Sequence, residues 1–171
     1  MSALNIGESF IGSGAEAAHV NTVLGSRLGP VGTAWATALA TPSSGHVPFI
    51  AVLSPGVAVK PMTLFVNKAA IASEAHGNLT WGAAQAGIAG GVADAVSDGV
   101  VAVDDLDDLV LIAAVWVNPA AVDADLVYRN NREAARTALG NGAVGRPTTE
   151  EVLAARLRPS NPFYAPTADP A

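Results

Sequence analysis

The stretch VPFIAVLSPGVAVKPMTLFVNKAAI, residues 47–71, is the longest apolar stretch of the chain, and we expect the fold to be organised around it. It contains two compact apolar runs, residues 49–53 and 62–67, each bounded by Pro or Gly. Short runs of this kind, rich in Val, Ile and Phe, are typical of buried strands. The second predicted strand ends on Asn67 and Lys68. Because a cation at the end of a buried strand must reach water or a partner, the group that Lys68 faces is the first functional question.

The chain has 171 residues, which is enough for one domain with a substantial core. It shows no internal repeat and no linker, so we expect a single domain over residues 1–171 with an irregular, Pro-rich tail from residue 159. Half of the residues are hydrophobic and only 14% are charged. Because such a chain has little polar surface for a monomer, we expect a homo-oligomer.

Charge and cysteine usage argue against several function classes. A net charge of −6 leaves no basic face to neutralise phosphates, which argues against a nucleic-acid binder. The absence of cysteine excludes disulfides and thiolate metal sites. The sequence begins without a signal-peptide pattern and has no apolar run of transmembrane length, so we expect a cytoplasmic protein with no membrane partner.

The other elements are predicted from hydrophobic periodicity and from Gly and Pro positions. Strands are expected over residues 4–11, 16–24 and 109–117, the last of them central. The segment 16–24 also has helical features, but the glycines before it favour a hairpin with the first strand. Helices are expected over residues 30–39, 81–97, 120–139 and 149–157, with a turn or helix start at 73–79. This order predicts an α/β, or α+β, two-layer fold with helices on one face of a sheet.

Glycines predict one close helix contact and one helix end. Gly87, Gly90 and Gly91 lie within the third predicted helix and would let another backbone approach closely. Gly140 and Gly142 are expected to end the fourth predicted helix at residue 139.

The three histidines are the first candidates for chemistry. His46 and His76 lie in polar segments, where exposed side chains without a role are expected. His19 lies in an apolar segment of small residues, where a structural role is the simpler interpretation. A catalytic role stays open because imidazole titrates near neutral pH.

Other motifs are weak. There is no G-x-S-x-G elbow, no metal-ligand spacing of histidines and no calcium loop in the acidic segment 104–108. The glycines at 87–91 lie within a helix, which argues against a dinucleotide fingerprint. Gln85 follows Trp81 by one helical turn. This pair could bind a planar heterocycle or could be packed in the core.

Several segments together resemble the formaldehyde-activating enzyme family. The matching segments run in order along nearly the whole chain: residues 6–21, 49–68, 82–87, 104–117, 131–134 and 161–163. The resemblance implies homopentamers of one α/β domain with a ribosomal-protein-S5-domain-2-like fold. It also implies a lyase that condenses formaldehyde with tetrahydromethanopterin, giving the methylene adduct and water, with no tightly bound cofactor and no metal.

The resemblance also assigns roles to residues of this chain. It places the proton donor at His19. It places the pterin-contacting positions at five residues: Asn21, Ile50, Lys68, Ala70 and Gln85.

Two of these positions depart from the family pattern. The family generally has Asp where this chain has Asn21, and Thr where it has Ala70, whereas Ile50 for Leu is a mild change. Each lost polar contact weakens ligand binding by roughly 1 kcal/mol. Two alternatives therefore stay open: a paralogue acting on a different amine, thiol or carbonyl compound, and a non-catalytic ligand-binding oligomer.

Overall fold

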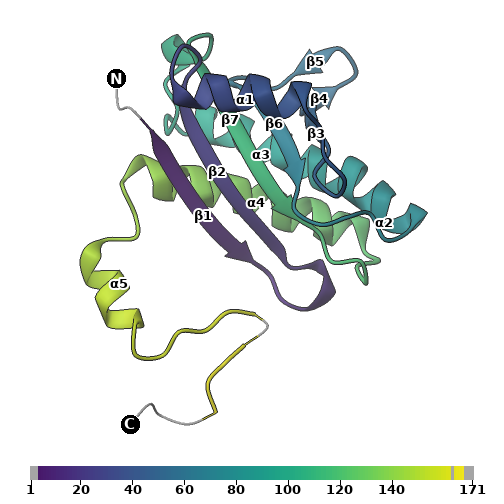
Figure 1. Cartoon of the computed structure of the whole chain (residues 1–171), viewed down its shortest axis with the longest axis vertical. Coiled ribbons are helices and arrows are strands. Elements are labelled where there is room, and N and C mark those ends of the chain that lie inside the picture. The colour runs from purple at the N-terminus through teal and green to yellow at the C-terminus, as the bar shows by residue number, and fades with distance from the viewer. Residues whose placement is uncertain (1–3, 163, 168–171) are drawn as a thin grey trace.

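The computed structural model describes residues 4–162 and 164–167, and its main feature is a mixed five-stranded sheet (Figure 1). The strand order is β1-β2-β7-β6-β3, and only β6 and β7 run parallel. The bounds of these strands are β1 Asn5–Ile11, β2 Ala18–Ser26, β3 Pro48–Ile50, β6 Met62–Asn67 and β7 Leu109–Trp116. A second, two-stranded sheet is formed by β4, Val52–Ser54, and β5, Val57–Ala58.

Helices cover one face of the large sheet and only one end of its opposite face. The bounds are α1 Pro30–Ala40, α2 Glu74–Asn78, α3 Gln85–Ser97, α4 Ala124–Ala143 and α5 Thr149–Ala155. A π-helical segment, Leu79–Ala84, joins α2 to α3, and short 3-10 turns span Gly14–Glu16 and Val103–Asp105. Helices α3 and α4 lie behind the sheet in Figure 1, whereas α1 crosses one end of the front face. The predicted α+β class is confirmed, with α1 added on the face opposite α3 and α4.

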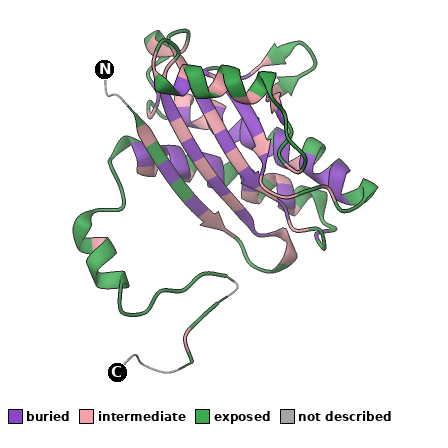
Figure 2. Ribbon diagram, in the orientation of Figure 1, coloured by how far each residue is buried: buried purple, intermediate pink, exposed green. Residues whose placement is uncertain are grey.

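Alternation along the strands decides which residues reach the core. On β2, Val20 and Leu24 join the hydrophobic core with α3 and α4, whereas His19 and Asn21 are only half-buried on the other face. Figure 2 shows this alternation as bands along β2 and β7. Because side chains of a strand point alternately to opposite faces, the front face receives every second residue of each strand. We call this front face, beyond the part that α1 covers, the open face.

Glycines bring the two long helices together, as the sequence predicts. A Cβ on Gly87 would lie 2.5 Å from the carbonyl oxygen of Tyr128, and one on Gly91 would lie 2.2 Å from that of Arg132. The same contact is closed on its solvent side by an ion pair, with Arg132 Nε 2.6 Å from a carboxylate oxygen of Asp94. Helix α4 is thereby held close to α3, and the pair forms the rigid back of the sheet.

The prediction of one continuous strand over residues 49–53 is wrong, because the structure divides this stretch into β3 and β4. The chain changes partner at Ala51, whose N–H donates to Thr63 while its carbonyl accepts from Val59. Residues before Ala51 therefore pair with β6, and those after it pair with β5. The second predicted strand, residues 62–67, is confirmed as β6.

The predicted end of the fourth helix is also wrong. Helix α4 starts four residues later than expected, capped by Asp123, and continues through both glycines to Ala143. Gly142 is buried against the backbone of Ile6 and Gly7. This tertiary contact with β1 outweighs the cost of about 1 kcal/mol for a helical glycine. The helix ends just before Gly145, which has a φ of +69°.

The C-terminal part stands away from the sheet. Helix α5, within the predicted range 149–157, begins with a capping box between Thr148 and Glu151 and has no buried residue. After α5 the chain runs back toward the turn end of the β1–β2 hairpin (Figure 1). Phe163, part of the family match at 161–163, and residues 168–171 of the predicted irregular tail lie outside the described residues.

Candidate active site

The strand register places His19 and Asn21 on the open face, next to β7. His19 pairs with Trp116 and Asn21 with Ala114. Lys68 follows β6 on the far side of β7 and continues the ladder, since its N–H donates to the carbonyl of Val115 at 2.8 Å. Strands two positions apart are separated by about 10 Å. The long side chain of Lys68 spans this distance over β7 and meets the two polar residues of β2.

The ammonium group of Lys68 contacts two side chains, which answers the question that the sequence raises. Its Nζ donates to Asn21 Oδ1 at 2.7 Å and lies 3.1 Å from His19 Nδ1. An ammonium group has only donors, so Nδ1 must be the acceptor. The proton of the neutral imidazole is therefore on Nε2.

Residues of β1 hold the other side of the imidazole. His19 Nε2 lies 3.0 Å from Glu8 Oε1, and Phe10 stacks on the ring with a centroid distance of 4.0 Å and an interplanar angle of 9°. The β1–β2 register pairs Phe10 with His19 and Glu8 with Asn21. The ring is thus restrained by a carboxylate, an ammonium and an aromatic face.

Burial and neighbouring charges shift both titrating nitrogens of this cluster. Burial lowers the pKa of Lys68 to about 8, and the carboxylate of Glu8 opposes that shift. Burial and the adjacent Lys68 lower the pKa of His19, again against Glu8. At neutral pH the pair therefore carries one positive charge, on Lys68, beside a neutral His19.

Two buried polar residues shape the loop that carries Lys68. Asn67 accepts from the N–H of Val47 at 2.8 Å and donates to the carbonyl of Ala69 at 2.7 Å. His76 accepts at Nδ1 from the N–H of Ala72 and contacts the carbonyl of Val117 at 3.0 Å through Nε2. Since His76 is only 2% exposed, its predicted place as an exposed side chain is wrong. His46 is exposed, as expected, with Nδ1 3.0 Å from the carbonyl of Asn67.

The structure brings together three of the six residues to which the resemblance assigns roles, and places the other three elsewhere. Gln85 donates to the carbonyl of Val52 at 2.8 Å and is buried. Ile50 lies on β3 opposite Leu64, at the other edge of the sheet from β1. Ala70 is exposed beside Gly45.

Glu8 and Phe10 are residues that sequence reasoning missed. Both lie in the segment 6–21, which already contains His19. A signal was present, because a hairpin pairs alternate residues of its two strands on one face. Applying that register to the predicted hairpin would have placed both side chains beside His19.

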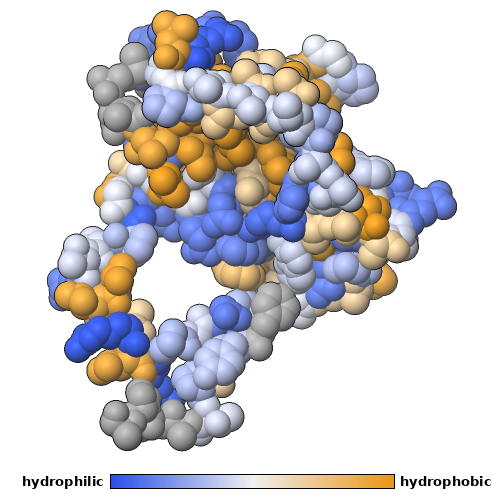
Figure 3. Space-filling model, in the orientation of Figure 1, coloured by the Kyte–Doolittle hydropathy of each residue, from blue (hydrophilic) through white to orange (hydrophobic). Residues whose placement is uncertain are grey.

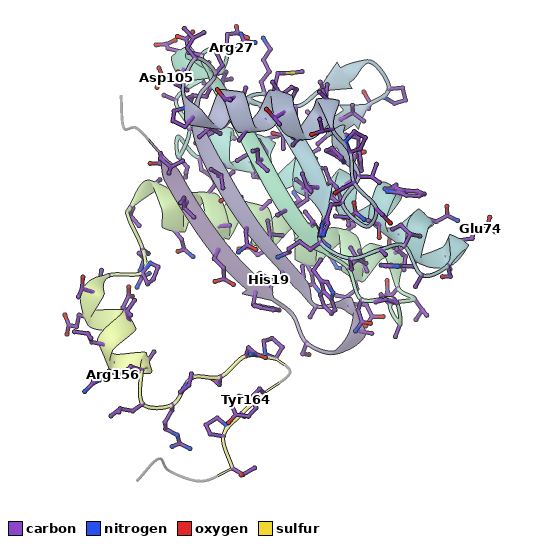
Figure 4. All side chains as sticks on the ribbon, viewed as in Figure 1. His19, Arg27, Glu74, Asp105, Arg156 and Tyr164 are labelled. Carbon is purple, nitrogen blue, oxygen red and sulfur yellow. The ribbon has the colours of Figure 1, made fainter. Side chains whose placement is uncertain are left out.

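A cleft lies over the imidazole. It has a volume of about 590 Å³ and is lined on one side by Glu8, Phe10 and His19. The opposite wall is formed by three residues of the C-terminal tail: Ser160, Asn161 and Pro162. Figure 4 shows His19 near the hairpin end of the sheet, with the tail carrying Tyr164 passing across from it. A larger hollow of about 770 Å³ adjoins this cleft at Glu8, between α5 and the sheet.

A restrained acid–base pair on an open sheet face, below a cleft, is an arrangement suited to small-molecule chemistry, and comparisons with known proteins assign the class. Residues 6–164 match the family model of the formaldehyde-activating enzyme (Fae). The chain belongs to this family.

Two relatives illustrate the match. The chain is 43% identical over 158 residues to the 5,6,7,8-tetrahydromethanopterin hydro-lyase of Methanosarcina barkeri, covering 92% of this chain and 89% of that protein. It is 40% identical over 148 residues to the bifunctional enzyme Fae/Hps of Methanococcoides burtonii, covering 86% of this chain but 37% of that protein. The chain therefore spans most of the first relative and less than half of the second.

Within residues 4–162 and 164–167, no group of three or more His, Asp or Glu side chains is placed to hold a metal ion. Over the same residues, every helix is too short or too polar to cross a membrane.

Proposed function

We propose that this chain is a lyase that condenses formaldehyde with tetrahydromethanopterin, or a related tetrahydropterin, to the methylene adduct and water. The observation that carries the proposal is the cluster of His19, Lys68 and Asn21 beneath the cleft, in a chain of this family. The relative from Methanosarcina barkeri has the matching activity in its name. We propose no tightly bound cofactor, and we place the protein in the cytoplasm and in one-carbon metabolism.

His19 is the proposed general acid. Formaldehyde adds readily to a secondary amine, and the demanding step is the loss of the hydroxyl group of the resulting carbinolamine. Protonation of that hydroxyl by His19 lets it leave as water. The second nitrogen of the pterin then attacks the iminium carbon and closes the ring. Lys68 binds an anionic or carbonyl oxygen of the substrate. Holding both pterin nitrogens in place raises the rate of ring closure by proximity.

The proposed pterin contacts fall into two groups. Asn21 and Lys68 lie at the His19 cluster, whereas Ile50 and Gln85 lie at the β3–β4 side of the molecule. Ala70 lies on the loop after Lys68. A pocket that uses both groups is most simply completed between copies of the chain.

The open face supports such an assembly, which we propose to be a homopentamer. Ile6, Val23 and Ile112 are in register on this face, and Ile6 is 58% exposed. Figure 3 shows hydrophobic side chains gathered over the sheet below α1. An exposed apolar area of this kind marks an interaction surface.

A second candidate function is a paralogue that acts on a different amine, thiol or carbonyl compound. Asn21 favours it, because its Oδ1 already accepts from Lys68. An Asn offers the ligand an N–H donor where a carboxylate would offer an acceptor. This site would therefore favour a ligand that presents an acceptor at this position.

The test is the initial rate of adduct formation from formaldehyde and tetrahydromethanopterin, compared with the spontaneous reaction. A rate well above the spontaneous one supports the proposal, and an equal rate contradicts it. Thermal shifts with tetrahydromethanopterin and tetrahydrofolate distinguish the candidates. Stabilisation by tetrahydromethanopterin alone counts against the paralogue, and stabilisation by neither counts against both pterins.

A further inference from the structure

We propose that Glu8, to which neither the resemblance nor the comparisons assign a role, is a positioning residue that orients His19 and keeps one transferable proton in the His19–Lys68 pair. This inference rests on the proposed function, because it names how the general acid of that reaction is held and charged. The first test of the role of Glu8 needs no substrate, so its result does not depend on whether the proposed function is correct.

The three groups form a chain of contacts across two neighbouring strands and the end of a third. Glu8 Oε1 lies 3.0 Å from His19 Nε2, and Lys68 Nζ lies 3.1 Å from His19 Nδ1. The side chain of Glu8 is 55% accessible to solvent, whereas the side chain of His19 is 27% accessible. Glu8 therefore contacts the imidazole from the cleft side, and Lys68 contacts it from the sheet.

The count of donors and acceptors limits the charge of the pair. If His19 and Lys68 were both protonated, Nδ1–H would point at an ammonium group, donor against donor. That doubly protonated arrangement is disfavoured, so near neutral pH the pair holds one proton between Nδ1 of His19 and Nζ of Lys68. Lys68 therefore acts as the store of the proton that His19 delivers.

Glu8 stabilises both arrangements. When His19 is neutral, the carboxylate accepts its Nε2–H and holds the ring with Nδ1 toward Lys68. When His19 is cationic, the carboxylate is the counter-charge beside it. The same carboxylate raises the pKa of His19 and that of Lys68 against the lowering by burial.

The proton balances through the reaction. A proton from the pair goes to the carbinolamine hydroxyl, the C–O bond breaks, and water leaves an iminium. The second amine nitrogen then forms the new C–N bond and loses its proton. That proton returns to the pair, so the site ends in its starting charge and no oxidant or reductant is consumed.

Other charged groups near Glu8 belong to α5 and the segments around it. Arg146, Arg156, Arg158 and Glu151 line the larger hollow that Glu8 also borders. Arg146 is paired with Glu151. On the strands, the polar groups facing His19 are Glu8, Lys68 and Asn21, which itself contacts Lys68. Among the described residues, Glu8 is therefore the carboxylate that contacts the imidazole.

The first measurement is the titration of His19 by NMR in the free protein. Glu8→Gln keeps the size and an acceptor oxygen but removes the charge, and we expect its His19 titration at a lower pH by about half a unit or more. Glu8→Asp keeps the charge and should lie between Glu8→Gln and the wild type. The control Glu150→Gln, on exposed α5, should titrate like the wild type. An unchanged titration in Glu8→Gln would overturn the proposal.

The second measurement is the pH profile of kcat. A positioning residue of this kind contributes about 10- to 100-fold, so we expect Glu8→Gln to lower kcat by about tenfold with a smaller change in KM. The basic limb of the kcat profile of Glu8→Gln should also move to lower pH, in the same direction as its NMR titration. A lower kcat with an unmoved limb indicates a merely structural role and contradicts the proposal. If the wild type does not exceed the spontaneous rate, the proposed function fails, while the NMR titration still decides the role of Glu8.

Discussion

Lys68 reaches across β7 to place its ammonium 3.1 Å from Nδ1 of His19, although the two residues are 49 positions apart in the chain. The contact depends on the parallel pairing of β6 with β7 and the antiparallel pairing of β2 with β7. It joins a cation with a lowered pKa to the candidate general acid. Each prediction below tests one consequence of this geometry or of the fold that holds it.

Replacing Lys68 by Met should lower kcat and shift the basic limb of the pH profile of kcat to lower pH. In the wild type the pair loses its proton near the pKa of Lys68, about 8. In Lys68→Met the pKa of His19 rises, because the adjacent cation is gone, although burial still lowers it. The basic limb of the kcat profile should therefore move down from about 8 to the lower pH at which His19 titrates without Lys68. A limb that stays in place would show that Lys68 does not share the proton of His19.

Lys68 should also make stability depend on pH. Its pKa falls from 10.5 in the unfolded chain to about 8 in the folded one, so between these values the unfolded chain binds more protons. The free energy of unfolding therefore rises with pH across that window, relative to Lys68→Met. Below it, the penalty for the partly buried charge is fully present. Urea denaturation at about pH 7.5 and about pH 10 tests this, and a parallel change in both proteins would contradict it.

Replacing Phe10 by Leu should affect catalysis more than folding. The ring of Phe10 stacks on His19 at 4.0 Å, and Leu keeps apolar bulk but loses the flat face. An aromatic pair contributes about 0.5–1.5 kcal/mol beyond burial, so stability should fall by about 1 kcal/mol. We expect kcat to fall several-fold because the imidazole is less restrained. Denaturation and steady-state kinetics measure the two effects, and an unchanged kcat would remove Phe10 from the site.

The contact between α3 and α4 should not tolerate a methyl group. A Cβ on Gly91 would lie 2.2 Å from the carbonyl oxygen of Arg132, so Gly91→Ala should destabilise the fold by about 1–3 kcal/mol. Gly140 is the matched control, since a Cβ there meets nothing within 4 Å. Gly140→Ala should stabilise the fold by about 0.5–1 kcal/mol, because helical glycine is costly. Equal effects of the two substitutions would contradict the packing described here.

The sequence predicts the elements with their own local signals. The central strand β7, the strand β6, the hairpin of β1 and β2 and the short helix α5 are all confirmed. The break at Ala51 and the continuation of α4 through Gly142 were missed, because both depend on contacts with distant strands. No local pattern shows which backbone will lie against a glycine.

The candidate site was predicted in part. His19, Asn21 and Lys68 are brought together as the family resemblance implies, but Glu8 became visible only through the strand register. His76 was misjudged, because its neighbours in sequence are polar although its side chain is buried against the carbonyl of Val117, just after β7. Gln85 lies in a polar contact with β4 that no spacing along the chain could reveal.

The most direct test of the central claim compares wild type with His19→Ala in the condensation of formaldehyde with tetrahydromethanopterin. Both proteins should show the same oligomeric state and the same circular dichroism. We predict that the wild type exceeds the spontaneous rate and that His19→Ala loses about 100-fold or more of that excess, as expected for a general acid. A His19→Ala protein that retains the wild-type rate would contradict the assignment of His19 as the proton donor.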